Sequence, residues 1–201
     1  MGMPIKQKIF SAAELQGVSF VGETFSGCRF AGELLHFTTF DNCRFEACDL
    51  SNCVFEIVNF TNCAFPESKL SFLDFSDVSL ENCDFSTAIV QECLFQESKS
   101  GGKGETKTFD LRSCSFVAAD LQRTAFVQCD LRGVSFQKAN LEQAVFDRCQ
   151  LQKAQLSGAQ LAQTRFDACK IAQTELDVSG FLQLGMNQGF TVNESLGTDL
   201  E

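Results

Sequence analysis

Cysteine and histidine are the residue types in this chain that are best suited to catalysis or metal binding. The 201 residues include 11 Cys and a single His, His36. Cys43, Cys48 and Cys53 lie five residues apart, which is not a zinc-ligand spacing, and no further pair supports them. With one histidine, a Ser/His or Cys/His catalytic arrangement is not expected. The sequence therefore predicts no catalytic residue, no metal site, no cofactor and a non-enzymatic protein.

All the cysteines belong to a pattern that repeats every five residues. A Phe or Leu occupies almost every fifth position from Phe10 to Phe95, and the pattern restarts one register later from Leu111 to Leu176. A small residue stands two positions before most of these large residues, and every Cys occupies this small position. Helices repeat apolar residues at about 3.6 and strands at 2, so a period of five requires one bend in each repeat.

Each unit is therefore expected to be a short extended piece with two inward side chains, one large and one small, followed by a corner. This places the thiols inside the protein, where small buried hydrophobes are favoured over metal ligands. Asn-Cys pairs recur every twenty residues, at Cys43, Cys63 and Cys83. Four units make one turn, which predicts an all-β solenoid of square cross-section with about eight coils.

The units Cys48-Asp49-Leu50, Ala119-Asp120-Leu121 and Ala139-Asn140-Leu141 resemble the A(D/N)LXX repeat of the pentapeptide-repeat family. The resemblance covers about residues 8–178 and implies a right-handed quadrilateral β-helix. We expect one repeat domain, residues 1–178, with a loop inserted at 96–110. Residues 179–201 are expected to form a short capping and dimerisation helix and an acidic tail.

Within that family the chain is most similar to the Qnr and MfpA type. The likeness lies in the length, the Cys- and Phe-rich N-terminal coils, the mid-chain loop and the Leu182–Val192 ending. It implies a dimeric rod that mimics duplex DNA, binds DNA gyrase or topoisomerase IV and protects the enzyme from fluoroquinolones. The alternative is a pentapeptide-repeat scaffold that binds another cytoplasmic regulatory protein.

Departures from the repeat are the candidate partner-binding sites. The loop has a glycine-rich, charged centre and is either a tolerated insertion or a partner-binding segment through Lys99, Lys103, Glu105 and Lys107. An apolar stripe is expected on the outside of the rod, at positions where polar residues are usual. We expect either the loop or a partner to cover this possible interface, made of Leu34, Phe37, Val54 and Ile57.

The C-terminal segment is predicted to form a short apolar helix, with Ser179 as N-cap and Gly189 as its stop. Such a helix is expected to close the open last coil. It carries more apolar surface than closure requires, which favours a two-fold dimer through this end. The residues expected to cap the rod and form the dimer are Phe181, Leu182, Leu184, Met186, Phe190 and Val192.

The net charge of −10 lies mostly in residues 1–95. Direct binding of nucleic acid is not expected, because phosphate contacts need Lys and Arg, although an acidic rod can compete with nucleic acid for a basic partner. Solubility of a Phe-rich rod explains the charge equally well. The predicted acidic surface consists of Asp41, Glu46, Asp49, Glu56, Asp74, Asp77 and Glu81.

The location is expected to be cytoplasmic. The odd number of cysteines and the lack of a recognisable signal peptide indicate a reducing compartment. No apolar run approaches the length of a membrane span, so no membrane association is expected.

Overall fold

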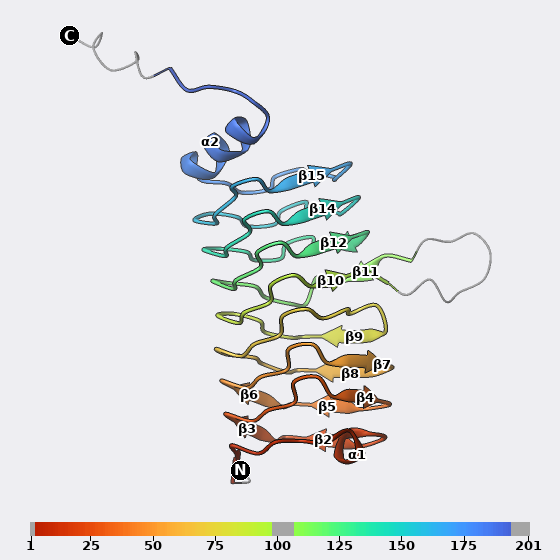
Figure 1. Cartoon of the computed structure of the whole chain (residues 1–201). Helices are drawn as coiled ribbons and strands as arrows, with labels where there is room; N and C mark the ends of the chain where they lie inside the picture. Colours follow the sequence, from red (N-terminus) through yellow and green to blue (C-terminus); the bar gives the residue numbers. More distant parts are fainter. Residues whose placement is uncertain (1–2, 98–106, 194–201) are drawn as a thin grey trace.

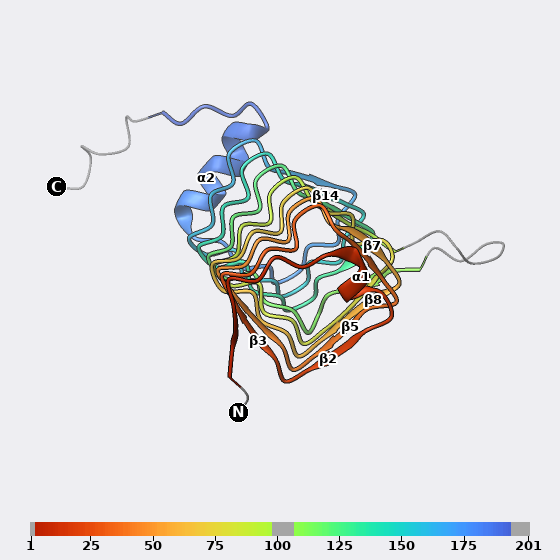
Figure 2. The same ribbon diagram turned by 60° about the horizontal axis from the view of Figure 1, so that its bottom comes forward.

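The computed structural model describes residues 3–97 and 107–193. The chain winds as a right-handed quadrilateral β-helix of about eight coils, with the N-terminus at one end of the rod and a helix at the other (Figure 1). The view in Figure 2 shows the square cross-section and the stacking of successive coils. The all-β solenoid, the square coil and the C-terminal helix predicted from the sequence are confirmed.

Short parallel strands lie on three of the four faces of the rod, and each of these faces is named here by one of its strands. The β3 face holds β1 (Ile5–Lys6), β3 (Thr24–Ser26) and β6 (Arg44–Glu46). The β5 face holds β2 (Ser19–Val21), β5 (Thr39–Asp41), β8 (Val58–Thr61), β9 (Val78–Glu81), β11 (Phe109–Asp110) and β13 (Cys129–Asp130). The β4 face holds β4 (Leu34–His36), β7 (Val54–Glu56), β10 (Leu94–Phe95), β12 (Ala125–Val127), β14 (Val145–Asp147) and β15 (Arg165–Asp167).

The fourth face, the Leu50 face, is held by isolated bridges such as that between Asp49 and Lys69. Two helices complete the elements, α1 (Ala12–Leu15) in the first coil and α2 (Val178–Asn187) at the C-terminal end. Pairing residues are twenty apart within each block, as in the contact of Phe40 with Phe60. Across the inserted loop the register becomes 31, as between Leu94 and Ala125.

A left-handed backbone conformation makes the corner that the five-residue period requires. The second residue after an inward Phe or Leu has a positive φ in most repeats, near +50° to +60° for the non-glycine residues. Asn42, Asn62 and Asn82 occupy this position on the β5 face, with φ of 53°, 52° and 52°. Asparagine is among the residues that tolerate this conformation best, which accounts for the Asn that precedes Cys in four repeats, these three and Asn52 with a φ of 58°.

Phenylalanine rings fill the interior in parallel columns. Phe85 stacks on Phe65 with ring centroids 4.9 Å apart, and on Phe116 at 5.1 Å, so the column crosses the insertion without a gap. Rings of adjacent columns meet edge to face, as Phe85 and Phe95 do at 6.4 Å and 82°. Both arrangements are favourable for aromatic quadrupoles. Each buried Phe contributes about 1.5–3 kcal/mol of hydrophobic stabilisation.

The small inward side chains also link successive coils by hydrogen bonds. The Cys93 thiol donates to the carbonyl of Leu70 at 2.8 Å, one coil below, and the Cys53 thiol donates to the carbonyl of Phe30 at 3.1 Å. Hydroxyls do the same, as Thr38 Oγ1 does toward the Leu15 carbonyl at 2.6 Å. The small position therefore selects Cys, Thr or Ser as buried donors as well as small apolar groups.

Burial keeps these thiols neutral. Desolvation raises the pKa of Cys53, Cys83 and Cys93 to about 12. A thiol that stays protonated donates a hydrogen bond and is a poor nucleophile. This agrees with the role of buried packing groups that the sequence favoured for the cysteines.

Replacing Cys93 by Ala should cost more stability than replacing Cys114 by Ala. Both thiols are buried, but in the described residues the Cys114 thiol donates to no backbone carbonyl, whereas Cys93 also accepts from the Leu73 N–H at 3.4 Å. Unpaired buried backbone groups should add about 1–3 kcal/mol to the cost of Cys93→Ala in urea unfolding. Cys93→Ser should recover part of the loss, and equal losses for the two Ala variants would contradict the donor role.

Candidate functional site

Helix α2 closes part of the last coil by supplying side-chain amides where a further coil would supply backbone groups. The Gln183 Oε1 accepts from the Leu161 N–H at 2.7 Å, and the Asn187 Oδ1 accepts from the Gln163 N–H at 2.9 Å. The Asn187 Nδ2 also donates to the Leu161 carbonyl at 2.7 Å. Residues 183 and 187 are one helical turn apart, so both amides face the same strand edge.

The helix begins two residues earlier than predicted. Its N-cap is Asp177 and not Ser179, because the Asp177 carboxylate accepts from the Gly180 N–H and from the Gly158 N–H of the coil below, both at 2.7 Å. These two hydrogen bonds lower the pKa of Asp177. Gly189 has a φ of +88° directly after the last turn, as expected of a residue that stops a helix.

The outer side of α2 presents a large apolar surface to solvent. Phe181 is 70% exposed and Phe190 is 73% exposed, and the surface also includes Leu182, Met186 and Val192. Leu184 differs from these predicted dimer residues because it packs partly against the core. The structure thus divides the predicted set into Leu184, which packs against the core, and five exposed apolar residues, three on α2 and two, Phe190 and Val192, in the segment that follows it.

The inserted loop leaves the rod at the corner between the β4 face and the β5 face. Lys99, Lys103 and Glu105 lie outside the described residues. Lys107 is described, and its ammonium lies 3.8 Å from the Glu97 carboxylate on the other side of the insertion. β10 and β11 mark the two ends of the insertion on the rod (Figure 1).

The predicted apolar stripe lies on the same corner, in the coils that precede the loop. Phe37 is 58% exposed and Ile57 is 55% exposed, while Val54 is exposed and Leu34 is half-buried on the adjoining β4 face. The pairing of β4 with β7 brings Leu34 beside Val54. Leu34 and Val54 therefore form one apolar pair on the β4 face, and Phe37 and Ile57 lie at the following corner, with the His36–Glu56 ion pair between the two groups. Nothing in the described residues shows what covers them.

The ladder of backbone bridges is interrupted at two places in the described residues. The regular register would pair Val54 with Asp74 on the β4 face and Ser79 with Asp110 on the β5 face, and neither bridge forms. At both places an unusually large residue occupies the small inward position of the upper coil. These residues are Leu73, above Cys53, and Phe109, above Val78.

A groove lies at the second interruption, between β9 and β11. It has a volume of about 510 Å³ and is lined by both strands together with Ile57, Asp77, Glu97 and Lys107. The sequence reasoning missed this groove. The signal was present, because Phe109 breaks the rule that a small residue stands two positions before the inward Leu111.

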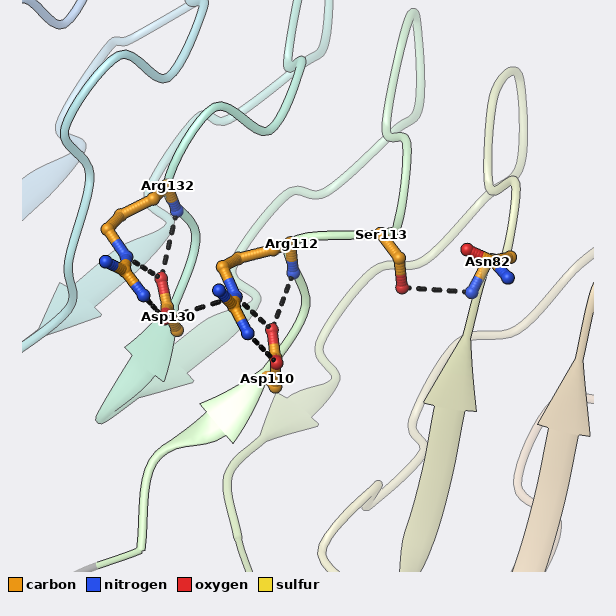
Figure 3. Close-up of polar contacts among 6 residues, drawn as sticks. All are labelled: Asn82, Asp110, Arg112, Ser113, Asp130 and Arg132. Carbon is orange, nitrogen blue, oxygen red and sulfur yellow. Dashed lines mark hydrogen bonds and ion pairs between the residues drawn. The ribbon is translucent and has the colours of Figure 1, made fainter.

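Next to the groove, the β5 face carries paired charges (Figure 3). The Arg112 guanidinium binds the Asp110 carboxylate at 2.7 Å, and the Arg132 guanidinium binds the Asp130 carboxylate at 2.6 Å. Arg112 lies 3.4 Å from Asp130, which connects the two pairs, and it lowers the pKa of Asp110. At the neighbouring corner the Asn82 N–H is bound by the Ser113 hydroxyl at 3.0 Å, in place of a backbone carbonyl.

The acidic residues predicted as a surface are distributed around the rod. The β5 face carries Asp41 and Glu81, the β3 face Glu46, and the β4 face Glu56. Asp49 lies on the Leu50 face, Asp74 on the β4 face and Asp77 at the corner that leads to the groove. The acidic character therefore surrounds the N-terminal half and is not a stripe along one face.

Among residues 3–97 and 107–193, no three or more His, Cys, Asp or Glu side chains are grouped so that they could hold a metal ion. Within the same ranges, no helix has the length and apolar character needed to cross a bilayer.

A comparison with known protein families agrees with the repeat β-helix described above. Residues 107–176 match the family model described as "Pentapeptide repeat region". No curated protein matches the sequence. The chain thus contains a pentapeptide-repeat region, and the whole rod has the pentapeptide-repeat β-helix fold.

Solved structures of the same fold include a plasmid-mediated fluoroquinolone resistance protein. One trypsin-treated variant of this protein, QnrB1, aligns with a TM-score of 0.64 and 16% identity, covering 96% of this chain and 100% of that chain. A second trypsin-treated QnrB1 variant aligns with a TM-score of 0.51 and 15% identity, and the alignment covers 94% of this chain and 97% of that chain. HetL of Nostoc sp. strain PCC 7120 is a pentapeptide repeat protein involved in heterocyst differentiation regulation. It aligns with a TM-score of 0.41 and 16% identity, and the alignment covers 82% of this chain and 87% of that chain.

Proposed function

We propose that this chain is a non-enzymatic, cytoplasmic rod that mimics duplex DNA, binds DNA gyrase or topoisomerase IV and protects the enzyme from quinolones. The observation that carries the proposal is the fold shared with QnrB1 over 96% of this chain and 100% of that one. QnrB1 is described as a fluoroquinolone resistance protein. The mid-chain loop and the Leu182–Val192 ending, which carried the resemblance in sequence, support the same function.

The distribution of acidic side chains on the rod is consistent with a partner that has a basic binding surface. The N-terminal coils carry acidic side chains on every face, so the rod presents negative charge from whichever side it approaches. An enzyme that binds duplex DNA has a basic groove, and an acidic rod can occupy it through the same long-range attraction that steers DNA. In the C-terminal half, Arg112 and Arg132 neutralise the nearby carboxylates.

The filled interior supports a binding role over catalysis. Columns of Phe and Leu occupy the axis, and the rod's large inward side chains are almost all buried. Catalytic sites are usually concave pockets with convergent polar groups. The groove between β9 and β11 is a surface feature flanked by strand edges, and we propose no reaction for it.

A DNA-supercoiling assay tests the topoisomerase proposal. Gyrase inhibited by a fluoroquinolone should regain supercoiling as this protein is titrated in. A variant with Asp41→Asn, Glu56→Gln and Asp74→Asn should need at least tenfold more protein for the same rescue, because three charges of the N-terminal half are removed.

The matched control, Glu142→Gln with Asp167→Asn and Glu175→Gln, loses the same charge from the C-terminal half and should rescue as the parent protein does. No rescue and no inhibition of gyrase at micromolar protein would contradict the topoisomerase proposal. Equal rescue by both charge variants would leave gyrase as the partner but would contradict the role of the N-terminal acidic residues in binding it.

The alternative function is a scaffold for another cytoplasmic regulatory protein. It is favoured by the apolar surface residues Leu34, Phe37, Val54 and Ile57, since solvent-exposed Phe and Ile on neighbouring coils are typical of a protein interface. The substitution Phe37→Ser with Ile57→Ser separates the two functions. It should leave gyrase rescue unchanged if the first function is correct and these residues have no part in it.

We also propose that the protein is a homodimer through the outer side of α2. Light scattering should give twice the monomer mass. The double substitution Phe181→Ser with Met186→Ser should reduce this to the monomer mass, because it removes two exposed apolar side chains. The substitutions leave the capping hydrogen bonds of Gln183 and Asn187 in place. Ile9→Ser, which alters an equally exposed apolar residue at the other end of the rod, is the matched control. A monomeric parent protein at tens of micromolar would contradict the dimer.

A further inference from the structure

We propose that the groove between β9 and β11 binds an extended, basic segment of a partner protein by β-strand addition. The inference goes beyond the proposed function, because it assigns a separate peptide site and does not depend on which protein supplies the segment. Its first basis is the missing bridge between Ser79 and Asp110. In the same step the other three faces remain paired, through Asp84–Ser115, Ile89–Asp120 and Leu94–Ala125.

The two strands therefore have edges that no described strand covers. β9 pairs with β8 below it, and β11 pairs with β13 above it, but β9 and β11 belong to separate sheets. In the regular parallel ladder the central residue of each strand donates its N–H to the coil above, as Phe45 donates to the Ala64 carbonyl at 2.8 Å. By that pattern, the free edge of β9 offers the Leu80 N–H and the Val78 carbonyl to an added strand.

Phe109 is the physical cause of the opening. Its phenyl ring occupies the small inward position, which holds Val58, Val78 and Cys129 in other coils of the same face. A ring at this position needs more space than one coil step provides, so β11 is held away from β9. Leu73 has the same effect on the β4 face, where the bridge between Val54 and Asp74 is also missing. Valine at the small position leaves the ladder intact, as between β8 and β9.

Side chains around the groove determine what kind of strand fits. Val78, Leu80 and Phe109 are slightly exposed compared with the central rings and supply an apolar floor. Asp77 directly precedes β9, Glu81 is the last residue of β9, and Glu97 also lines the groove. Lys107 and Arg112 each lie beside a carboxylate, Glu97 and Asp110 respectively, so the balance around the groove is negative. Alternating apolar and basic residues suit such a groove, because successive side chains of a strand point to opposite sides.

Ser113 closes one end of the groove. Its hydroxyl accepts the Asn82 N–H at 3.0 Å and so joins the two coils again at that corner (Figure 3). Ile57, Asp77 and Glu97 line the groove toward its other end. The volume of about 510 Å³ fits a few residues of an added strand.

Fluorescence anisotropy with the full chain tests the inference. The probe is a labelled acetyl-Lys-Val-Lys-Val-Lys amide, and the two controls are the same peptide with Glu in place of Lys and one with N-methylated valines. The Lys peptide should bind, and both controls should bind at least tenfold more weakly. Hydrogen exchange should slow at the Leu80 amide when the Lys peptide is present.

The variant Phe109→Val should close the groove, because valine at this position is compatible with a paired ladder in the coil below. The variant should bind the Lys peptide at least tenfold more weakly. Hydrogen exchange at the Leu80 amide should be slower in the variant than in the parent protein when no peptide is present. If Phe109→Val does not fold, the second variant is Asp77→Asn with Glu97→Gln. It should bind the Lys peptide at least fivefold more weakly, while its melting temperature stays that of the parent protein.

Equal binding of the Lys and N-methylated peptides, equal binding of the Lys and Glu peptides, or no binding at millimolar peptide would each overturn the inference. Protection of the Leu80 amide that grows with protein concentration alone would overturn it in favour of a second copy of this chain.

Discussion

Contact between inward side chains of successive coils is the interaction on which the rest of this structure depends. Each large side chain lies on the equivalent side chain twenty residues away, or 31 residues away across the insertion, and each small one donates to or packs against the coil below. Backbone bridges form between coils only where this stacking brings the strands to the normal spacing. The core therefore sets the rise per coil, and the sheets on the four faces follow from it.

This dependence explains where the rod departs from regularity. An insertion between Phe95 and Phe109 leaves the core intact, because Phe116 and Phe126 continue the ring columns directly above Phe85 and Phe95. One large side chain at a small position has a greater local effect, since it separates two strands while the other faces stay paired. The insertion is thus tolerated, whereas each missing bridge among the described residues coincides with an enlarged inward residue, Leu73 or Phe109.

Much of the fold could be predicted from the sequence because its pattern reports the core directly. The inward Phe and Leu, the small position and the twenty-residue turn all follow from spacing. Asp177 was missed as N-cap because its carboxylate also binds Gly158, a contact between coils that spacing does not reveal. Helix α1 was missed although Ser11 and Glu14 have the spacing of a capping box, with the Ser11 N–H bound by Glu14 at 3.0 Å. The groove at Phe109 depends on how one ring displaces a strand, which needs three-dimensional packing.

The central claim, a dry and filled axis, is tested most directly by counting reactive thiols. All 11 cysteines occupy the inward small position, and ten are buried while Cys169, at the end of the rod, is half-buried. With a thiol reagent at pH 8, we expect at most one cysteine of the native protein to react within minutes and all eleven to react in denaturant. Rapid reaction of several thiols in the native protein would contradict the account.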